Sequence, residues 1–367
     1  NSSMDGYAVR SADLVETGDD SALVRVVVRG EVAAGDPAAL SVRPGEAVRI
    51  MTGAPVPEGA DCIVMVEATG IEGDRVVIDR RKAGSMRPGT FIRRRGEDVR
   101  AGDTVIPAGS VLGPRRIGLA AALGHAVVPA YRAPRVVIVS TGAELVEPGI
   151  PLRAGQIYDA NSYLLEAAVR EMGVPVARAA VVGDSDAEFL AALDTAVDGA
   201  DLVVTTGGVS MGDYDVVKSA LRDRGVEFVQ VAMQPGKPQG FGRYGSGGTP
   251  ILTLPGNPVS AFVSFEVFVR PAIRQLLGMP LTTPLQSGRM SAAMRSPRGR
   301  RQFARVIASP SESGWRLAPL EGQGSHFVAD LARANALAVV SEEVVEVSVG
   351  DVVDFWLLAA SDAEVPS

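Results

Sequence analysis

Four acidic side chains follow predicted strands in the central part of the chain, and their placement suggests metal chemistry. They occupy three loops: Glu144 after the strand at 135–140, Asp184 after the strand at 176–182, and Asp213 and Asp215 after the strand at 201–206. Ligands bind outside the carboxyl ends of the strands in open parallel sheets. Carboxylates that gather there repel one another unless they bind a cation or keep a proton. We therefore predict a Mg²⁺ ion bridging these carboxylates to substrate phosphates, with helix capping by each aspartate as the simpler alternative.

The segment TTGGVSMGDYD at 205–215 adds groups that suit an anion. Gly207 and Gly208 let the backbone approach a ligand closely. The helix that follows offers free N–H groups to a phosphate. No GK[ST] follows, so the segment is not a Walker A loop. A tight turn from strand to helix would explain the glycines, but it would not explain Ser210 and Asp213 as well.

Two proline-containing segments follow further along the chain. QPGKPQGFG at 234–242 holds Lys237 between two prolines, which stiffen the loop and remove N–H donors. A rigid loop that presents one cation suits an oxyanion or a phosphate, although a single lysine is also an ordinary surface residue. LPGNPVSAF at 254–262 turns from strand into helix with Ser260 in the first turn, which suits an anion or simply a capped helix.

The composition excludes several classes of protein. The 367 residues carry a formal net charge of −7, so no basic surface predicts a nucleic acid as partner. Cys62 is the only cysteine, and His125 and His326 are the only histidines, which excludes cysteine-rich zinc and iron–sulfur sites and gives little support to nucleophilic catalysis. We expect Cys62 in the core and both histidines in structural or surface positions. No apolar run reaches ~18 residues and no signal peptide is visible, which predicts a cytoplasmic protein without a membrane span.

Three parts of the chain must position these residues, and they differ in pattern. Residues 1–132 contain short Val- and Ile-rich runs broken by turns, with a helical stretch at 113–124, and predict a β-rich N-terminal region with a small helical unit. Residues 133–279 alternate apolar strands with helices of about 10–15 residues, which predicts a three-layer α/β domain around a mostly parallel sheet. Residues 280–367 alternate apolar and polar residues and predict a C-terminal β-barrel.

Capping residues and prolines give two helix boundaries in the α/β domain. Asn161 or Ser162 is expected to cap the helix at 160–173. A single long helix is expected at 257–278, and Pro271 should kink it or end it early.

Together these motifs resemble molybdopterin molybdenumtransferases, including the E domain of gephyrin. The matching segments run in family order: SSMDGYAVR (2–10), RIMTGAPVPEGADCIVMVE (49–67), RGED (95–98), VSTGAELVEPG (139–149), TTGGVSMGDYD (205–215), QPGKPQGFG (234–242) and LPGNPVSAF (254–262). MDGYA and MTGAP single out the molybdenum-inserting enzymes, whereas TGGVS is shared with molybdopterin adenylyltransferases. The resemblance implies an elongated homodimer with four structural units: a small helical piece, an inserted β domain, the α/β domain and a C-terminal β-barrel.

The resemblance also implies a reaction. Adenylated molybdopterin and molybdate are the substrates, molybdate is inserted at the dithiolene, AMP is released and Mg²⁺ is needed. Besides the second subunit, molybdopterin adenylyltransferase and molybdoenzymes are the implied partners.

Individual residues take roles from the same resemblance. Asp5 of MDGYA and Thr52 of MTGAP resemble active-site groups donated by the partner subunit, with Asp98 of GED as a further candidate. Glu144, Asp184 and Asp215 resemble the carboxylates that handle Mg²⁺ and the hydrolytic water. The implied substrate-binding residues are Gly207, Gly208, Ser210, Asp213, Lys237, Pro238, Ser260, Arg300 and Ser325, of which the last two come from the barrel domain.

The sequence departs from the family pattern at two places. The helix that usually precedes MDGYA is absent, and Gln234 stands where the family often has lysine, so one cation of the implied oxyanion site is missing.

Two alternative functions remain open. Nucleotidyl transfer to a pterin would use the same α/β module, but it would need only residues like 133–279. A scaffold that binds a partner peptide, as gephyrin does, would have no need for Glu144, Asp184 and Asp215 together.

Overall fold

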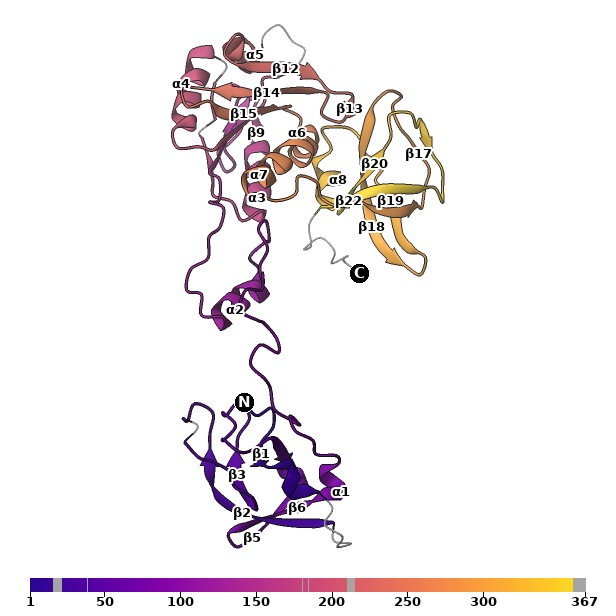
Figure 1. Ribbon diagram of the computed structural model, residues 1–367. Helices are drawn as coiled ribbons and strands as arrows, with labels where there is room; N and C mark the ends of the chain where they lie inside the picture. Colours follow the sequence, from indigo (N-terminus) through magenta and orange to yellow (C-terminus); the bar gives the residue numbers. More distant parts are fainter. Residues whose placement is uncertain (16–21, 38, 180, 184, 210–214, 359–367) are drawn as a thin grey trace. The chain divides into compact units, whose positions relative to one another are not determined.

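A computed structural model describes residues 1–15, 22–37, 39–179, 181–183, 185–209 and 215–358 (Figure 1). The chain forms two compact units, Asn1–Pro107 and Ala108–Ser367. The first unit is shorter than the N-terminal region that the sequence pattern outlines, because the helix at residues 114–122 belongs to the second unit. Asp184, Ser210 and Asp213, which the sequence singles out, lie outside the described residues.

The first unit is built on one six-stranded sheet with the order β4-β1-β3-β2-β6-β5. Its strands are β1 (Gly6–Val9), β2 (Leu23–Val32), β3 (Glu46–Ile50), β4 (Cys62–Met65), β5 (Thr69–Glu72) and β6 (Arg75–Asp79), and helical turns lie at Ser11–Leu14, Val66–Ala68 and α1 (Arg80–Ala83). Successive residues of a strand point to opposite faces. Tyr7 and Val9 of β1 accordingly pack in one core cluster and Ala8 in another. The β-rich fold expected here is confirmed.

Cys62 lies in the core of this unit, as expected, and its side chain is fully buried. Burial and the neighbouring Asp61 carboxylate raise the pKa of the Cys62 thiol to about 12. Because the thiolate is the reactive form, we predict that a thiol reagent such as DTNB at pH 8 leaves the native protein unlabelled. The same reagent should titrate one thiol per chain in denaturant. Rapid labelling of the native protein would show that this part of the core opens readily.

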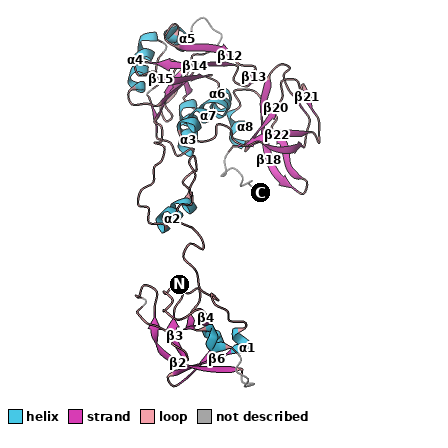
Figure 2. Ribbon diagram, viewed as in Figure 1, coloured by secondary structure: helices cyan, strands magenta, loops and turns pink. Residues whose placement is uncertain are grey.

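The second unit contains the α/β domain, whose sheet has the order β10-β7-β11-β15-β14-β12 (Figure 2). The strands are β7 (Val136–Ser140), β10 (Val176–Arg178), β11 (Leu202–Thr206), β12 (Val226–Gln230), β14 (Pro238–Tyr244) and β15 (Thr249–Leu254). The strands β10, β7, β11 and β15 are parallel, whereas β14 and β12 pair antiparallel at one side. The mostly parallel sheet predicted from the apolar strand runs is therefore confirmed.

Helices cover both faces of this sheet. They are α3 (Asn161–Glu171), α4 (Asp186–Val197), α5 (Val216–Leu221), α6 (Pro258–Ser264) and α7 (Arg270–Leu276). Alternate residues of β7 divide between two cores: Val137 and Val139 pack with α4 and α5, and Val136 and Ile138 pack with α3 and α7. This double burial makes the strands almost continuously apolar and gives the three layers that the sequence predicted.

Of two local expectations in this domain, one is confirmed and one is wrong. The long helix expected at 257–278 runs from α6 through a π-helical turn at Phe265–Val269 into α7, and this irregularity lies directly before Pro271, where the proline was expected to kink it. Proline has no N–H to donate, so the i→i−4 pattern is interrupted around it. The segment QPGKPQGFG, expected as a loop, continues into strand β14, with Pro238 at its first residue, where a proline is tolerated.

The C-terminal part of the second unit is a closed β-barrel, as predicted. Its sheet has the order β13-β18-β19-β16-β22-β20, and it closes because β18 pairs with both β19 and β20. The strands are β13 (Met233–Gln234), β16 (Gln286–Met290), β18 (Arg301–Ser311), β19 (Gly314–Pro319), β20 (Ala336–Val340) and β22 (Val352–Leu357), with a separate pair, β17 (Met294–Arg295) and β21 (Glu346–Val347). A hydrophobic cluster that includes Val259, Phe303 and Leu331 packs α6 and helix α8 (Val328–Arg333) against the barrel.

Three smaller elements complete the second unit. Helix α2 spans Pro114–Ala122, and β8 (Leu145–Val146) pairs with β9 (Ile157–Tyr158) in a two-stranded sheet. Within the described residues, no helix has the length and apolar character to cross a membrane.

Candidate active site

A cavity of about 820 Å³ lies where the strands β7, β11 and β15 end. The βα loops of the α/β domain form most of its wall, and the barrel domain contributes Ser325 and His326. Eight residues singled out from the sequence line it: Glu144, Gly207, Gly208, Asp215, Lys237, Pro238, Ser260 and Ser325. Loops that are far apart in the sequence therefore converge at the carboxyl edge of the sheet, where parallel sheets bind ligands.

Glycines make room for two carboxylates of this wall, Glu144 and Asp215. Gly142 has a φ of 152°, and a side chain on it would lie 2.7 Å from Oε2 of Glu144. Gly208 has a φ of 64°, and a Cβ there would lie 3.1 Å from Oδ1 of Asp215 and 2.5 Å from Val217. Only glycine tolerates such positions without strain, so the loops are shaped around the carboxylates.

The donor set fits a Mg²⁺ ion shared with a ligand. Asp215 is buried, whereas Glu144 is exposed, and carboxylate oxygens are the ligands that Mg²⁺ prefers. Among the described residues, no group of three His, Cys, Asp or Glu side chains could hold a metal by itself. Mg²⁺ commonly binds one or two carboxylates plus substrate phosphates, and the two carboxylates here match that mode.

Asp159 is a third carboxylate on the wall, and the sequence reasoning missed it. It is 1% exposed, and it accepts hydrogen bonds from the backbone N–H of Ser162 at 3.0 Å, the Ser162 hydroxyl at 2.6 Å and the Ser140 hydroxyl at 3.2 Å. Asp159 therefore caps α3, and the expectation that Asn161 or Ser162 does so is wrong. The capping signal in the sequence was present, but it lay one residue earlier than the stretch assigned to the helix.

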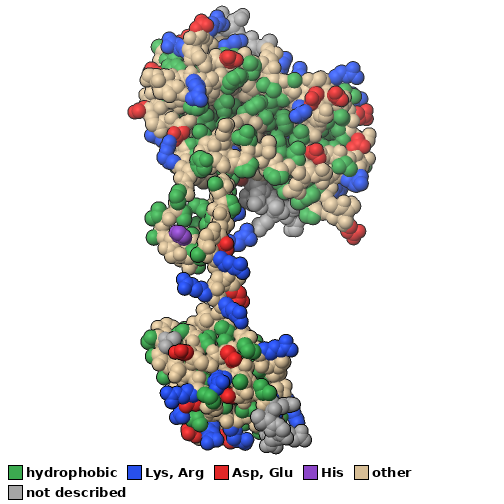
Figure 3. Space-filling view, viewed as in Figure 1, with side chains coloured by type: hydrophobic (Ala, Val, Ile, Leu, Met, Phe, Trp, Pro, Cys, Tyr) green, Lys and Arg blue, Asp and Glu red, His purple; other side chains and the backbone are tan. Residues whose placement is uncertain are grey.

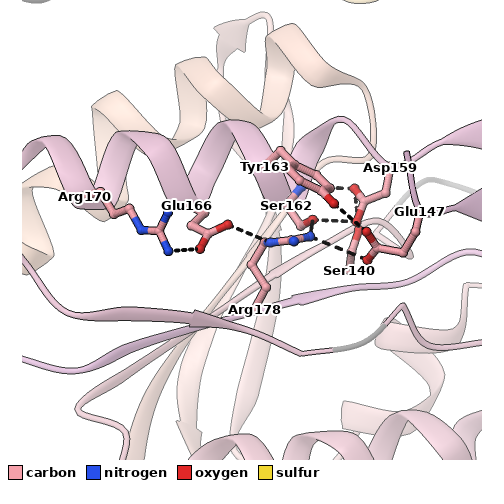
Figure 4. A network of polar contacts seen from close by, with 8 residues as sticks. All are labelled: Ser140, Glu147, Asp159, Ser162, Tyr163, Glu166, Arg170 and Arg178. Atoms are coloured by element: carbon pink, nitrogen blue, oxygen red, sulfur yellow. Dashed lines mark hydrogen bonds and ion pairs between the residues drawn. The ribbon is translucent and has the colours of Figure 1, made fainter. Parts of the chain in front are cut away.

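A polar network behind Asp159 holds this corner of the cavity in place (Figure 4). The guanidinium of Arg178 donates to Glu166 at 2.7 Å and to the Ser162 hydroxyl at 3.1 Å, and it lies 3.7 Å above the Tyr163 ring. The Tyr163 hydroxyl donates to Glu147 at 2.6 Å, which ties the end of β8 to α3. The strand pair that follows Glu144 is thus anchored to the body of the domain.

Asn161 links two loops of the wall instead of capping a helix. Its Nδ2 donates to the Thr206 hydroxyl at 2.9 Å and to the Gly256 carbonyl at 2.7 Å. These two acceptors lie at the ends of β11 and β15, so one amide fixes the spacing of both loops.

The barrel presents Ser325 to the cavity on a loop that a buried arginine holds. Nδ2 of Asn257 donates to the Ser325 hydroxyl at 3.0 Å, and Val259 N–H donates to the Ser325 carbonyl at 3.1 Å. Arg305 is 1% exposed, and its guanidinium donates to the carbonyls of Gly322 and Gly324. Burial lowers the pKa of Arg305, an effect that Asp330 opposes.

We predict that Arg305→Met loosens this loop. Two partly buried carbonyls lose a charged donor, which costs up to about 1–3 kcal/mol for each group left unsatisfied, so the urea midpoint should fall and Ser325 should be misplaced. Arg301→Met is the matched control, because Arg301 is exposed and pairs with Glu342 on the surface, where a pair contributes about 0–1 kcal/mol. Equal midpoints for the two variants would refute a structural role for Arg305.

Arg300 reaches the cavity through another side chain. Its Nη1 donates to Oε1 of Gln234 at 3.1 Å, and Gln234 lines the wall. The position at which the family often carries lysine is therefore occupied by an amide that is hydrogen-bonded to an arginine. His326 also lines the cavity, which the sequence did not suggest.

Asp5 and Thr52 lie together in the first unit. The backbone N–H and the hydroxyl of Thr52 donate to Oδ1 of Asp5 at 2.6 and 2.8 Å, and these bonds hold the pKa of Asp5 below its usual range. Asp98 lies in an exposed turn of the same unit. The roles of these three residues in the active site stay predictions.

Comparisons with known proteins agree with this architecture. Residues 1–124 match the family described as "MoeA N-terminal region (domain I and II)", residues 137–275 match "Probable molybdopterin binding domain", and residues 287–358 match "MoeA C-terminal region (domain IV)". The crystal structure of a molybdopterin biosynthesis MoeA protein from Pyrococcus horikoshii superposes with a TM-score of 0.81 at 31% sequence identity, covering 98% of this chain and 87% of that one.

Curated relatives extend the similarity over nearly the whole chain. Molybdopterin molybdenumtransferase 2 of Mycobacterium tuberculosis is 48% identical over 364 residues, which cover 97% of this chain and 88% of the relative. The molybdopterin molybdenumtransferase of Haemophilus influenzae is 38% identical over 357 residues, covering 96% and 86%. By its three matching regions, its fold and these relatives, the chain belongs to the molybdopterin molybdenumtransferase family.

Proposed function

We propose that this protein inserts molybdate into adenylated molybdopterin and releases AMP in a Mg²⁺-dependent reaction. The observation that carries the proposal is the single cavity that brings Glu144 and Asp215 together with Lys237 and two serine hydroxyls. Such a wall combines acceptors for a divalent cation with a cation and hydroxyl donors for an anion. The substrates of the proposed reaction need both, because one has a pyrophosphate and the other is an oxyanion.

The charge of each cavity residue suggests its role in the reaction. The ammonium group of Lys237 compensates the oxyanion, and the hydroxyls of Ser260 and Ser325 orient it. Mg²⁺, when bound, neutralises charge on the pyrophosphate. Either Glu144 or Asp215 orients a water molecule and accepts its proton as the water adds across the pyrophosphate bond and AMP leaves.

The test is AMP release from adenylated molybdopterin, followed by chromatography. We expect release with molybdate and Mg²⁺ present, a fall to background after EDTA treatment, and recovery when Mg²⁺ is added back. Unchanged AMP release in EDTA would contradict the metal dependence. Consumption of ATP with unadenylated molybdopterin would instead favour the nucleotidyl-transfer alternative.

We also propose that the protein is a homodimer, since α2 and its flanks carry uncovered apolar side chains. Ile117 is 57% exposed, and Val111, Leu123 and Tyr131 are exposed as well. Figure 3 shows hydrophobic side chains gathered over the α2 segment. An apolar surface of this kind marks an association site, and a second copy of the chain is the occupant that the family resemblance implies.

Light scattering on Ile117→Lys tests the dimer. The variant should shift the mass from two chains to one, because a buried charge disfavours the interface. Val229→Lys is the control, since Val229 is 37% exposed on β12. A native protein that already runs as one chain would contradict the proposal.

A further inference from the structure

The turn that carries Lys237 is held in place from behind by buried polar side chains. The turn spans residues 235–237, between β13 and β14, and Lys237 lies half-buried on the cavity wall. In the part of the chain that the structure describes, no hydrogen bond or ion pair joins its ammonium group to another side chain. The backbone of the turn therefore sets the point from which the Lys237 side chain extends into the cavity.

Gln239 is the centre of this support. It is 6% exposed, and its Nε2 donates to the Gly236 carbonyl at 2.7 Å and to the Ser264 hydroxyl at 2.5 Å. Ser264 lies on α6 and is fully buried. Gly236 has a φ of 101°, and a Cβ on it would lie 2.8 Å from the Ser264 oxygen. The turn therefore packs directly on α6, and one amide joins the two.

The other side of Lys237 is fixed as well. Val231 N–H donates to the Lys237 carbonyl at 2.8 Å, which closes the turn across its base. On the barrel side, Met233 and Gln234 pair with Arg301 and Gln302 of β18. Backbone hydrogen bonds thus hold both flanks of the turn, and the side-chain amide of Gln239 holds its middle residue, Gly236.

We propose that Gln239 and Ser264 are positioning residues for anion binding that act through Lys237. This inference rests on the proposed function, and it adds two residues that do not line the cavity. Their hydrogen bonds preorganise the cation, so that binding the oxyanion costs no ordering of the turn. Loss of the Gln239 side-chain amide would leave the Gly236 carbonyl without its donor and would let Lys237 occupy other positions.

The test is a double-mutant cycle on AMP release, with molybdate as the varied substrate. Gln239→Leu and, separately, Ser264→Ala should raise the KM for molybdate about 10-fold, because the turn loses a hydrogen bond and Lys237 is no longer held where the anion binds. The kcat should change less than the KM. In a Lys237→Ala background, Gln239→Leu should have no further effect, which a general loss of stability would not produce.

Tyr244→Phe is the matched control, because it removes one hydrogen bond, from the Tyr244 hydroxyl to Asp194 at 2.9 Å, elsewhere in the same domain. It should leave the KM for molybdate unchanged. An unaltered KM in both Gln239→Leu and Ser264→Ala, or a full effect of Gln239→Leu in the Lys237→Ala background, would overturn the proposal.

Hydrogen exchange separates this inference from the proposed function. The backbone amides of Gly236 and Lys237 should exchange faster in Gln239→Leu than in Tyr244→Phe, whatever the protein catalyses. If the native protein released no AMP with molybdate, the proposed function would be wrong. Unchanged hydrogen exchange in Gln239→Leu would show, independently, that Gln239 does not hold the turn in place.

Discussion

Asp215→Asn should lower the rate of AMP release about 1,000-fold, because a positioned carboxylate at a metal-assisted site contributes about that much to the rate. Asn has nearly the size and shape of Asp, so the substitution changes the packing of the cavity wall little. The thermal midpoint of the variant should therefore stay close to that of the native protein. The loss of activity would come from the loss of negative charge at the cavity wall, where Asp215 is 8% exposed.

Asp198→Asn is the control for this experiment. Asp198 is an exposed residue at the C-terminal end of α4 and is not part of the cavity wall. It should retain full activity and stability. AMP release at the native rate by Asp215→Asn would mean that this carboxylate neither binds the metal nor orients the water.

Lys237→Met should raise the KM for molybdate about 100-fold, since a charge-assisted contact to an anion in a desolvated site is worth roughly 3 kcal/mol. Methionine keeps much of the apolar stem of lysine, so the wall should stay packed. Lys82→Met is the control, because Lys82 is exposed on α1 of the first unit. An unchanged KM in Lys237→Met would remove the cation from the proposed anion site.

The convergence of the loops could be predicted because it depends on local patterns and one general rule. The apolar runs at β7 and β11 show buried parallel strands, and the residues after such strands meet at one edge. Glu144, Gly207 and Asp215 were found in this way, and all three line the cavity.

Several residues that shape the site could not be found from the sequence, because distant contacts define them. Arg305 holds a loop that begins 17 residues later, and Gln239 bonds to Ser264 on another element. No short sequence motif predicts either contact, and an arginine or glutamine in a strand is expected to be an ordinary surface residue. Strand β14 was missed for a different reason: Pro238 and two glycines hide its alternation.

The position of Arg300 was only partly predicted by the family resemblance. It was assigned to the anion pocket, and the structure places it one side chain away, where it donates to Gln234. The replacement of a lysine by glutamine at 234 therefore keeps a cation near the cavity, although on the barrel and not on the turn. The resemblance indicates that a lysine is missing at 234, but the geometry is needed to show where the remaining charge lies.

In the proposed reaction, this cavity couples cleavage of the pyrophosphate to insertion of molybdenum. The most direct measurement is the amount of molybdenum in the pterin product per AMP released, from adenylated molybdopterin, Mg²⁺ and molybdate in a single turnover. We expect one molybdenum atom per AMP with the native protein and neither product with Asp215→Asn. AMP without molybdenum in the pterin, or molybdenum insertion without AMP, would contradict it.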